Sequence, residues 1–64
     1  MSTFLERLEQ EADALALKTI SLSEITKTDN FEKLSEANQY LLKKQLEVML
    51  EYTNILTIRI ELNI

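Results

Sequence analysis

Residues 35–64 read SEANQYLLKKQLEVMLEYTNILTIRIELNI, and this stretch decides the fold. Ser35 has the side chain of a helix N-cap, and the apolar residues after it recur at three- and four-residue steps, which predicts a long helix. They form two rows, the first apolar row of Leu42, Leu46, Met49, Leu56 and Ile60 around Thr53, and the second apolar row of Leu41, Val48, Ile55 and Leu62. Together the rows cover roughly 200° of the helix surface, whereas one partner helix covers a stripe of roughly 100–140°.

A narrower amphipathic segment precedes the long helix. Thr3 and Glu6 have the spacing of a capping box ahead of it, and Asp29 with Glu32 repeats that spacing later in the chain. The apolar stripe consists of Leu5, Leu8, Ala12, Leu15, Thr19, Leu22 and Thr26. We predict one domain over residues 1–64, with a helix over about 3–26, a polar link over 27–30, and a short turn and long helix over 31–62.

The absence of glycine and proline disfavours tight hairpin turns between strands and favours an all-α fold. Two helices joined by a short polar link pack antiparallel, so we expect an all-α, antiparallel two-helix hairpin. The tail has two interpretations. Ile58, Ile60, Leu62 and Ile64 alternate with polar residues as in a strand, but they also extend the helical rows without a breaker.

The width of the apolar surface on the long helix predicts a helical-bundle homo-oligomer. A chain of 64 residues rarely gains more than about 3–5 kcal/mol from its own core. With no Cys and no His, disulfides and the usual zinc ligands are absent, so association with other copies is the remaining source of stability. In a lone hairpin we expect Val48, Met49, Ile55 and Leu62 to be uncovered. The expected oligomer interface consists of Leu42, Val48, Met49, Ile55, Leu56 and Leu62.

Composition argues against several functional classes. The net charge of −4 and the pI of about 4.6 disfavour nucleic-acid binding, which depends on Lys and Arg neutralising phosphates. No apolar run approaches the roughly 20 residues that span a bilayer, so we expect a soluble protein with no membrane partner. The carboxylate pairs Glu9/Asp13 and Glu47/Glu51 lie opposite the apolar stripes, as solvated residues do. We therefore expect no enzyme activity, no metal and no cofactor.

A polar row runs between the two apolar rows of the long helix, and it consists of Asn38, Gln45, Tyr52 and Arg59 at seven-residue spacing. One interpretation is that it sets register at a helix–helix seam, or that Arg59 reaches water at an edge. The other is a ligand site between subunits, with Tyr52 under a nucleotide base and Arg59 on a phosphate. Of the basic pair, we expect Lys43 near Glu47; Lys44 joins Gln45, Tyr52 and Arg59 as a candidate ligand-binding residue.

The apolar spacing of the second half carries a family resemblance. It involves the segments NFEKLS at 30–35, QYLLKKQLEVM at 39–49 and YTNILTIRI at 52–60. These segments resemble a group of small bacteriophage helical-hairpin proteins first noted in crAss-like phages. More distantly, the chain is similar in build to the phage sponge proteins that counter CBASS and Thoeris immunity.

The resemblance implies a phage accessory protein with counter-defence activity in the host cytoplasm. Sponge proteins sequester nucleotide second messengers, so the implied partner is a cyclic nucleotide or an ADP-ribose-type signal. No binding residue is carried over from those families. The alternative is a protein–protein interaction module that binds and inhibits or recruits a host protein.

Overall fold

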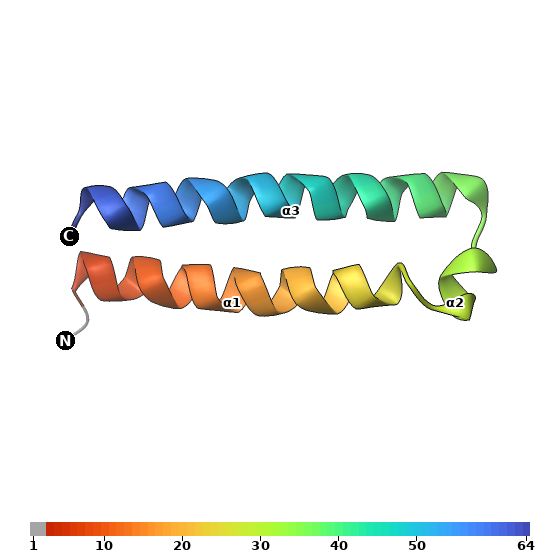
Figure 1. The fold of residues 1–64 in the computed structure, drawn as a ribbon, viewed down its shortest axis with the longest axis horizontal. Helices are drawn as coiled ribbons and strands as arrows, with labels where there is room; N and C mark the ends of the chain where they lie inside the picture. The colour runs from red at the N-terminus through yellow and green to blue at the C-terminus, as the bar shows by residue number, and fades with distance from the viewer. Residues whose placement is uncertain (1–2) are drawn as a thin grey trace.

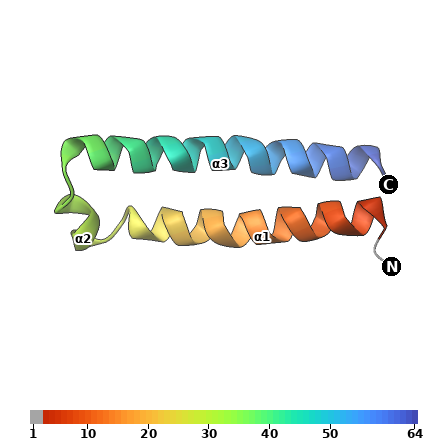
Figure 2. The same cartoon turned by 180° about the vertical axis from the view of Figure 1, so that it is seen from behind.

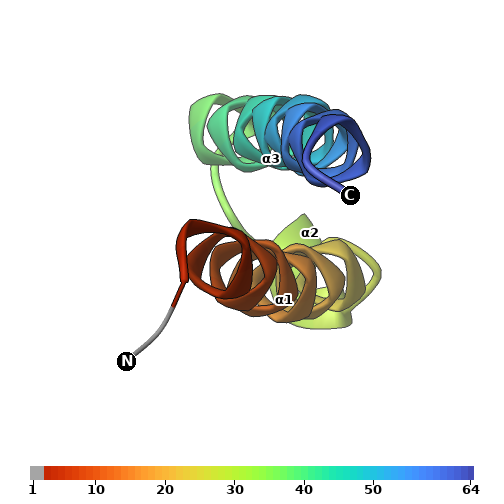
Figure 3. The ribbon, with the colours of Figure 1, turned by 90° about the vertical axis from the view of Figure 1, so that its left-hand side faces the viewer.

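The structure is a computed structural model that describes residues 3–64. It contains α1 (Phe4–Ile25), the short α2 (Asp29–Glu32) and α3 (Glu36–Leu62). The two long helices run antiparallel along their whole length, and α2 closes one end (Figures 1 and 2). The molecule measures 45 × 18 × 14 Å, and the end-on view shows α1 and α3 side by side as one layer (Figure 3). The predicted all-α hairpin is confirmed.

The alternating tail is helical. No strand occurs among residues 3–64, and α3 continues to Leu62 before Asn63 ends it. The Asn63 side chain donates to the Arg59 carbonyl at 2.7 Å, which satisfies one of the free carbonyls at the helix end. Unbroken helical periodicity outweighs the local alternation because each helical residue adds a backbone hydrogen bond to an already formed helix.

Hydroxyl side chains begin each helix. Thr3 accepts the Glu6 amide at 3.1 Å, and Ser35 accepts the Asn38 amide at 3.2 Å, as their positions predicted. At α2 the predicted Asp29 cap is wrong, because the cap is Thr28. Its hydroxyl accepts from the Phe31 amide at 3.3 Å and donates to the Ile25 carbonyl at 2.8 Å. One side chain thus joins the end of α1 to the start of α2.

The hydrophobic core is the seam between α1 and the first apolar row of α3. Only five side chains among residues 3–64 are buried, and Leu56 alone is fully so, at 0% exposure. The other four are Leu8, Thr19, Leu22 and Phe31. The buried Thr19 hydroxyl donates to the Leu15 carbonyl at 2.7 Å, so a small polar residue lies in the seam without an unsatisfied hydrogen bond.

The second apolar row remains uncovered in the single chain. Its residues range from 51% exposed at Val48 to 79% at Leu62, with Leu41 and Ile55 between. Met49 was expected with this uncovered set, but it is half-buried in the seam. The reason is its position seven residues before Leu56, which turns it toward α1. In the described part of the chain, no helix is long and apolar enough to cross a membrane.

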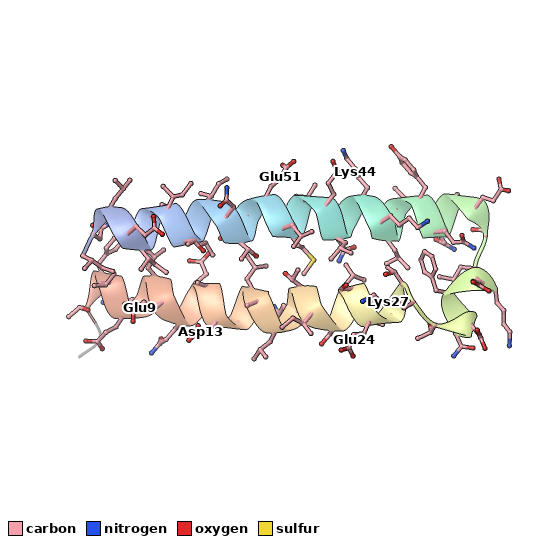
Figure 4. All side chains as sticks on the ribbon, in the orientation of Figure 1. Glu9, Asp13, Glu24, Lys27, Lys44 and Glu51 are labelled. Atoms are coloured by element: carbon pink, nitrogen blue, oxygen red, sulfur yellow. The ribbon has the colours of Figure 1, made fainter. Side chains whose placement is uncertain are left out.

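Charged side chains occupy the outer faces of the hairpin (Figure 4). Lys44 and Glu51 project from α3 on the side away from α1, and Asp13 projects from α1 on the side away from α3, one turn after Glu9. All four are exposed. Charged side chains therefore lie on the sides of the hairpin that neither long helix covers.

Candidate functional site

Three of the four predicted ligand-binding residues lie in one line along α3. Gln45, Tyr52 and Arg59 are seven residues apart, so each is turned by only about 20° from the one before it. All three are exposed. Their line lies between the first apolar row, which faces α1, and the uncovered second apolar row. The structure therefore brings them to one edge of the hairpin, which we call the polar edge.

Tyr52 is held in place from the opposite helix. Its hydroxyl donates a hydrogen bond to the carboxylate of Glu11 on α1. This hydrogen bond raises the pKa of Tyr52 above 10.0, and partial desolvation and the negative charge of Glu11 act in the same direction, against the positive charge of Arg59. Tyr52 as a whole residue stays 40% exposed. Tyr52 thus presents an oriented aromatic face at the polar edge.

Arg59 has a guanidinium group available for binding. It is exposed in the last turn of α3, where a positive charge is favoured by the helix dipole. It makes no ion pair with a carboxylate anywhere in residues 3–64. Guanidinium donors match the geometry of phosphate and carboxylate oxygens, so Arg59 is the side chain of this edge whose chemistry suits an anion.

Gln45 and Lys44 differ in how they relate to this edge. The Gln45 amide nitrogen lies 4.0 Å from the Met49 sulfur, a weak contact that leaves its amide oxygen free to accept. Lys44 projects away from α1 (Figure 4) and pairs with Glu47 at 3.6 Å. The structure therefore places Lys44 on the outer face, apart from the other three predicted residues.

Lys43 was expected near Glu47, but its ammonium group lies over another residue. Lys44 is the residue that approaches Glu47, and the Lys43 ammonium lies 5.7 Å from the ring centroid of Phe31. That distance is within the range of a cation–π contact. Lys43 therefore covers the buried Phe31 at the closed end of the hairpin.

The residue that sequence reasoning missed at the polar edge is Glu11. It belongs to a row of α1 residues spaced by seven, namely Phe4, Glu11, Lys18 and Ile25. This spacing was visible in the sequence, but only the contact between Glu11 and Tyr52 shows that the row adjoins the polar row of α3. Lys18, one heptad toward the turn, lies at the level of Gln45 in the same register.

A shallow groove of about 270 Å³ opens on the other edge of the hairpin. It is lined by Thr19, Ile20, Ser23, Glu24, Lys27, Leu46 and Leu50. Leu50 precedes Tyr52 by two residues, which is about 200° around the helix. The groove and the polar edge are therefore separate surfaces, and none of the predicted site residues lines the groove.

The fold and this edge define a small helical-hairpin protein with an exposed polar and aromatic row beside an uncovered apolar one. A family model described as Sequestin matches residues 2–62. The chain therefore belongs to the Sequestin family. The family name suggests a sequestering function, and the match supports the similarity to a sponge-like family. No curated protein matches the chain, and no solved structure does.

Proposed function

We propose that the chain is a phage accessory protein that sequesters a nucleotide-type immune signal in the host cytoplasm. It binds the signal without transforming it, as a homo-oligomer with the ligand held at the polar edge. The observation that supports this proposal most directly is the position of Tyr52, held by Glu11, on one exposed line with Arg59, which makes no ion pair with a carboxylate among residues 3–64. The membership in a family named for sequestration points to the same class of function.

The chemistry of the edge fits a nucleotide. An aromatic ring stacks on any base, and Tyr52 stays partly exposed while Glu11 accepts a hydrogen bond from its hydroxyl. A guanidinium binds phosphate oxygens through two parallel hydrogen bonds, which is the role we assign to Arg59. The side-chain amide of Gln45 adds a donor and an acceptor for the edge of a base.

The charge distribution favours a small anion over a nucleic-acid polymer. The chain carries a net charge of −4, and its outer faces carry Asp13 and Glu51. A long polyanion would meet these carboxylates, whereas a single nucleotide bound along the polar edge would meet Glu11, whose carboxylate accepts the hydrogen bond of Tyr52. The neighbouring second apolar row, once covered, would exclude water and strengthen the contacts with the phosphate.

The test is a thermal melt with a panel of cyclic dinucleotides and ADP-ribose derivatives. A ligand at 100 times its Kd adds about 2.7 kcal/mol to the folded state, which raises the Tm of a domain this small by roughly 10–20 °C. Tyr52→Leu should weaken this shift because it removes the stacking surface. Tyr52→Phe, the matched control, keeps the ring and should retain most of it.

A second function is favoured by one specific observation, the exposed second apolar row. An uncovered apolar row on a folded chain is also the surface by which a protein–protein interaction module binds a host protein. The same panel separates the two functions. If no nucleotide raises the Tm, the sequestering proposal is wrong and the host-protein function replaces it.

A further inference from the structure

The two exposed rows of α3 have nearly the same centre: the second apolar row is centred between Glu51 and Tyr52, and the pair Gln45 and Arg59 is centred on Tyr52. The second apolar row has leucine at both ends, Leu41 and Leu62, and β-branched residues between, Val48 and Ile55. Gln45 and Arg59 of the polar row lie one heptad on either side of Tyr52. Reversing the helix about the point between Glu51 and Tyr52 exchanges leucine with leucine and valine with isoleucine, and it brings Gln45 and Arg59 to within one residue of each other's level.

The partner that this face fits is a second copy of the same chain. With five buried side chains among residues 3–64, the hairpin has a thin core of its own, and a chain of this size is marginal without further burial. A partner that stabilises the hairpin by burying the second apolar row must be present whenever the hairpin is folded. A second copy of the chain is always present. A seven-residue repeat also matches a partner helix with the same repeat.

We propose that two copies pack their α3 helices antiparallel through the second apolar row, so that each nucleotide site is shared between copies. The two Tyr52 side chains lie near the two-fold axis, and Arg59 of one copy lies at the level of Gln45 of the other. The shared site rests on the proposed function. The antiparallel pairing does not.

Charge and length both favour this orientation. A parallel pair in register would place the two Arg59 side chains at the same level, where like charges repel. The antiparallel pair instead offers each guanidinium the free amide oxygen of Gln45. Tyr52 lies three residues from the middle of α3 (Glu36–Leu62), about 4.5 Å along the axis, so the two helices overlap over most of their length.

The pairing also completes the walls of the site. On the α3 surface, the polar row lies between the side that faces α1 and the side formed by the second apolar row. Glu11 on α1 already bounds it on one side through Tyr52. A second copy on the apolar row bounds it on the other side, and it brings Gln45 to Arg59 from across the two-fold axis.

The orientation is tested with engineered disulfides, since the chain has no cysteine of its own. Val48→Cys and Ile55→Cys are prepared singly and then refolded together under mild oxidation. We expect a disulfide dimer only in the mixture, joining one chain of each variant and identified by its mass. Glu47→Cys with Asn54→Cys, the same spacing on an outer face, is the control and should not crosslink. A disulfide dimer formed by Val48→Cys alone would show parallel pairing. The absence of any crosslink would show that the copies meet through another interface. Either result overturns the proposal.

The shared site is tested by complementation with ADP-ribose as the probe. Gln45→Leu and Arg59→Leu each remove one partner from both sites of a dimer, so each variant alone should bind weakly. A refolded mixture contains mixed dimers in which one site keeps both Gln45 and Arg59, so binding with wild-type affinity should return at a fraction of the sites. No recovery means that each site lies within one chain. If the wild type does not bind ADP-ribose, the shared site is overturned. The proposed function is then tested by the other ligands of the melt panel, and the antiparallel pairing is tested independently by the disulfides.

Discussion

Replacing Arg59 by leucine separates an anion-binding role from a structural one. Arg59 is exposed and has no ion pair among residues 3–64, so its removal breaks no salt bridge of the hairpin. Within the hairpin, the free energy of unfolding should fall by the helix-dipole contribution of about 0.3–1 kcal/mol, which lowers the Tm by less than about 8 °C. A leucine beside the second apolar row offsets part of that loss.

The effect on ligand binding should be larger than the effect on stability. A hydrogen bond to a charged group contributes about 1.5–3 kcal/mol, which corresponds to a Kd for ADP-ribose that is roughly 10- to 140-fold weaker. Isothermal titration calorimetry measures the Kd, and light scattering checks that the assembly is intact. Lys27→Leu removes a positive charge from the groove on the opposite edge, and it should leave the Kd unchanged.

Two results would refute this reasoning about Arg59. If Arg59→Leu and wild type bind ADP-ribose equally well, Arg59 does not contact the phosphate. If Arg59→Leu dissociates the assembly or loses its helical circular dichroism, Arg59 has a structural role at the contact between copies. Equal weakening by Lys27→Leu would show that overall charge, and not the position of Arg59, determines binding.

Three further changes test the fold and its edge. Ile55→Glu places a charge in the second apolar row and should dissociate the oligomer and lower the Tm, as light scattering and concentration-dependent melts would show; a wild-type assembly state would contradict the interface. Leu56→Ala truncates the one side chain that is fully buried among residues 3–64 and should cost about 2–5 kcal/mol, enough to unfold much of the hairpin by circular dichroism; a Tm near that of wild type would mean that the seam between α1 and α3 is not the core. In a Tyr40→Phe background, where Tyr52 is the single tyrosine, Glu11→Gln should lower the pKa of Tyr52 toward 10.0 in an absorbance titration. Because Glu11 raises that pKa in the folded state, the stabilisation from their hydrogen bond is fully present below pH 10.0 and is lost as the pH rises through the raised pKa, so an unchanged titration would argue against the contact.

The sequence by itself determined the local structure of this protein. The caps Thr3 and Ser35 and the unbroken three- and four-residue steps after them are signals within a few residues, and helices form from such short-range interactions. The exposed second apolar row also followed from the sequence, since the angular width of the apolar surface on α3 exceeds what α1 covers. The position of Gln45, Tyr52 and Arg59 on one line follows from helix geometry alone.

Only the tertiary structure decided which surfaces of the two helices meet. The register between α1 and α3 places Met49 in the seam and joins Tyr52 to Glu11, which is 41 positions away in the sequence. It also opens the groove on the edge opposite the polar row. This register depends on how the link between the helices closes, through Thr28 bonded to Ile25 and Gln39 bonded to Glu32 and Leu34. The periodicity of either helix carries no information about it, because a shift of one helix along the other leaves both patterns unchanged.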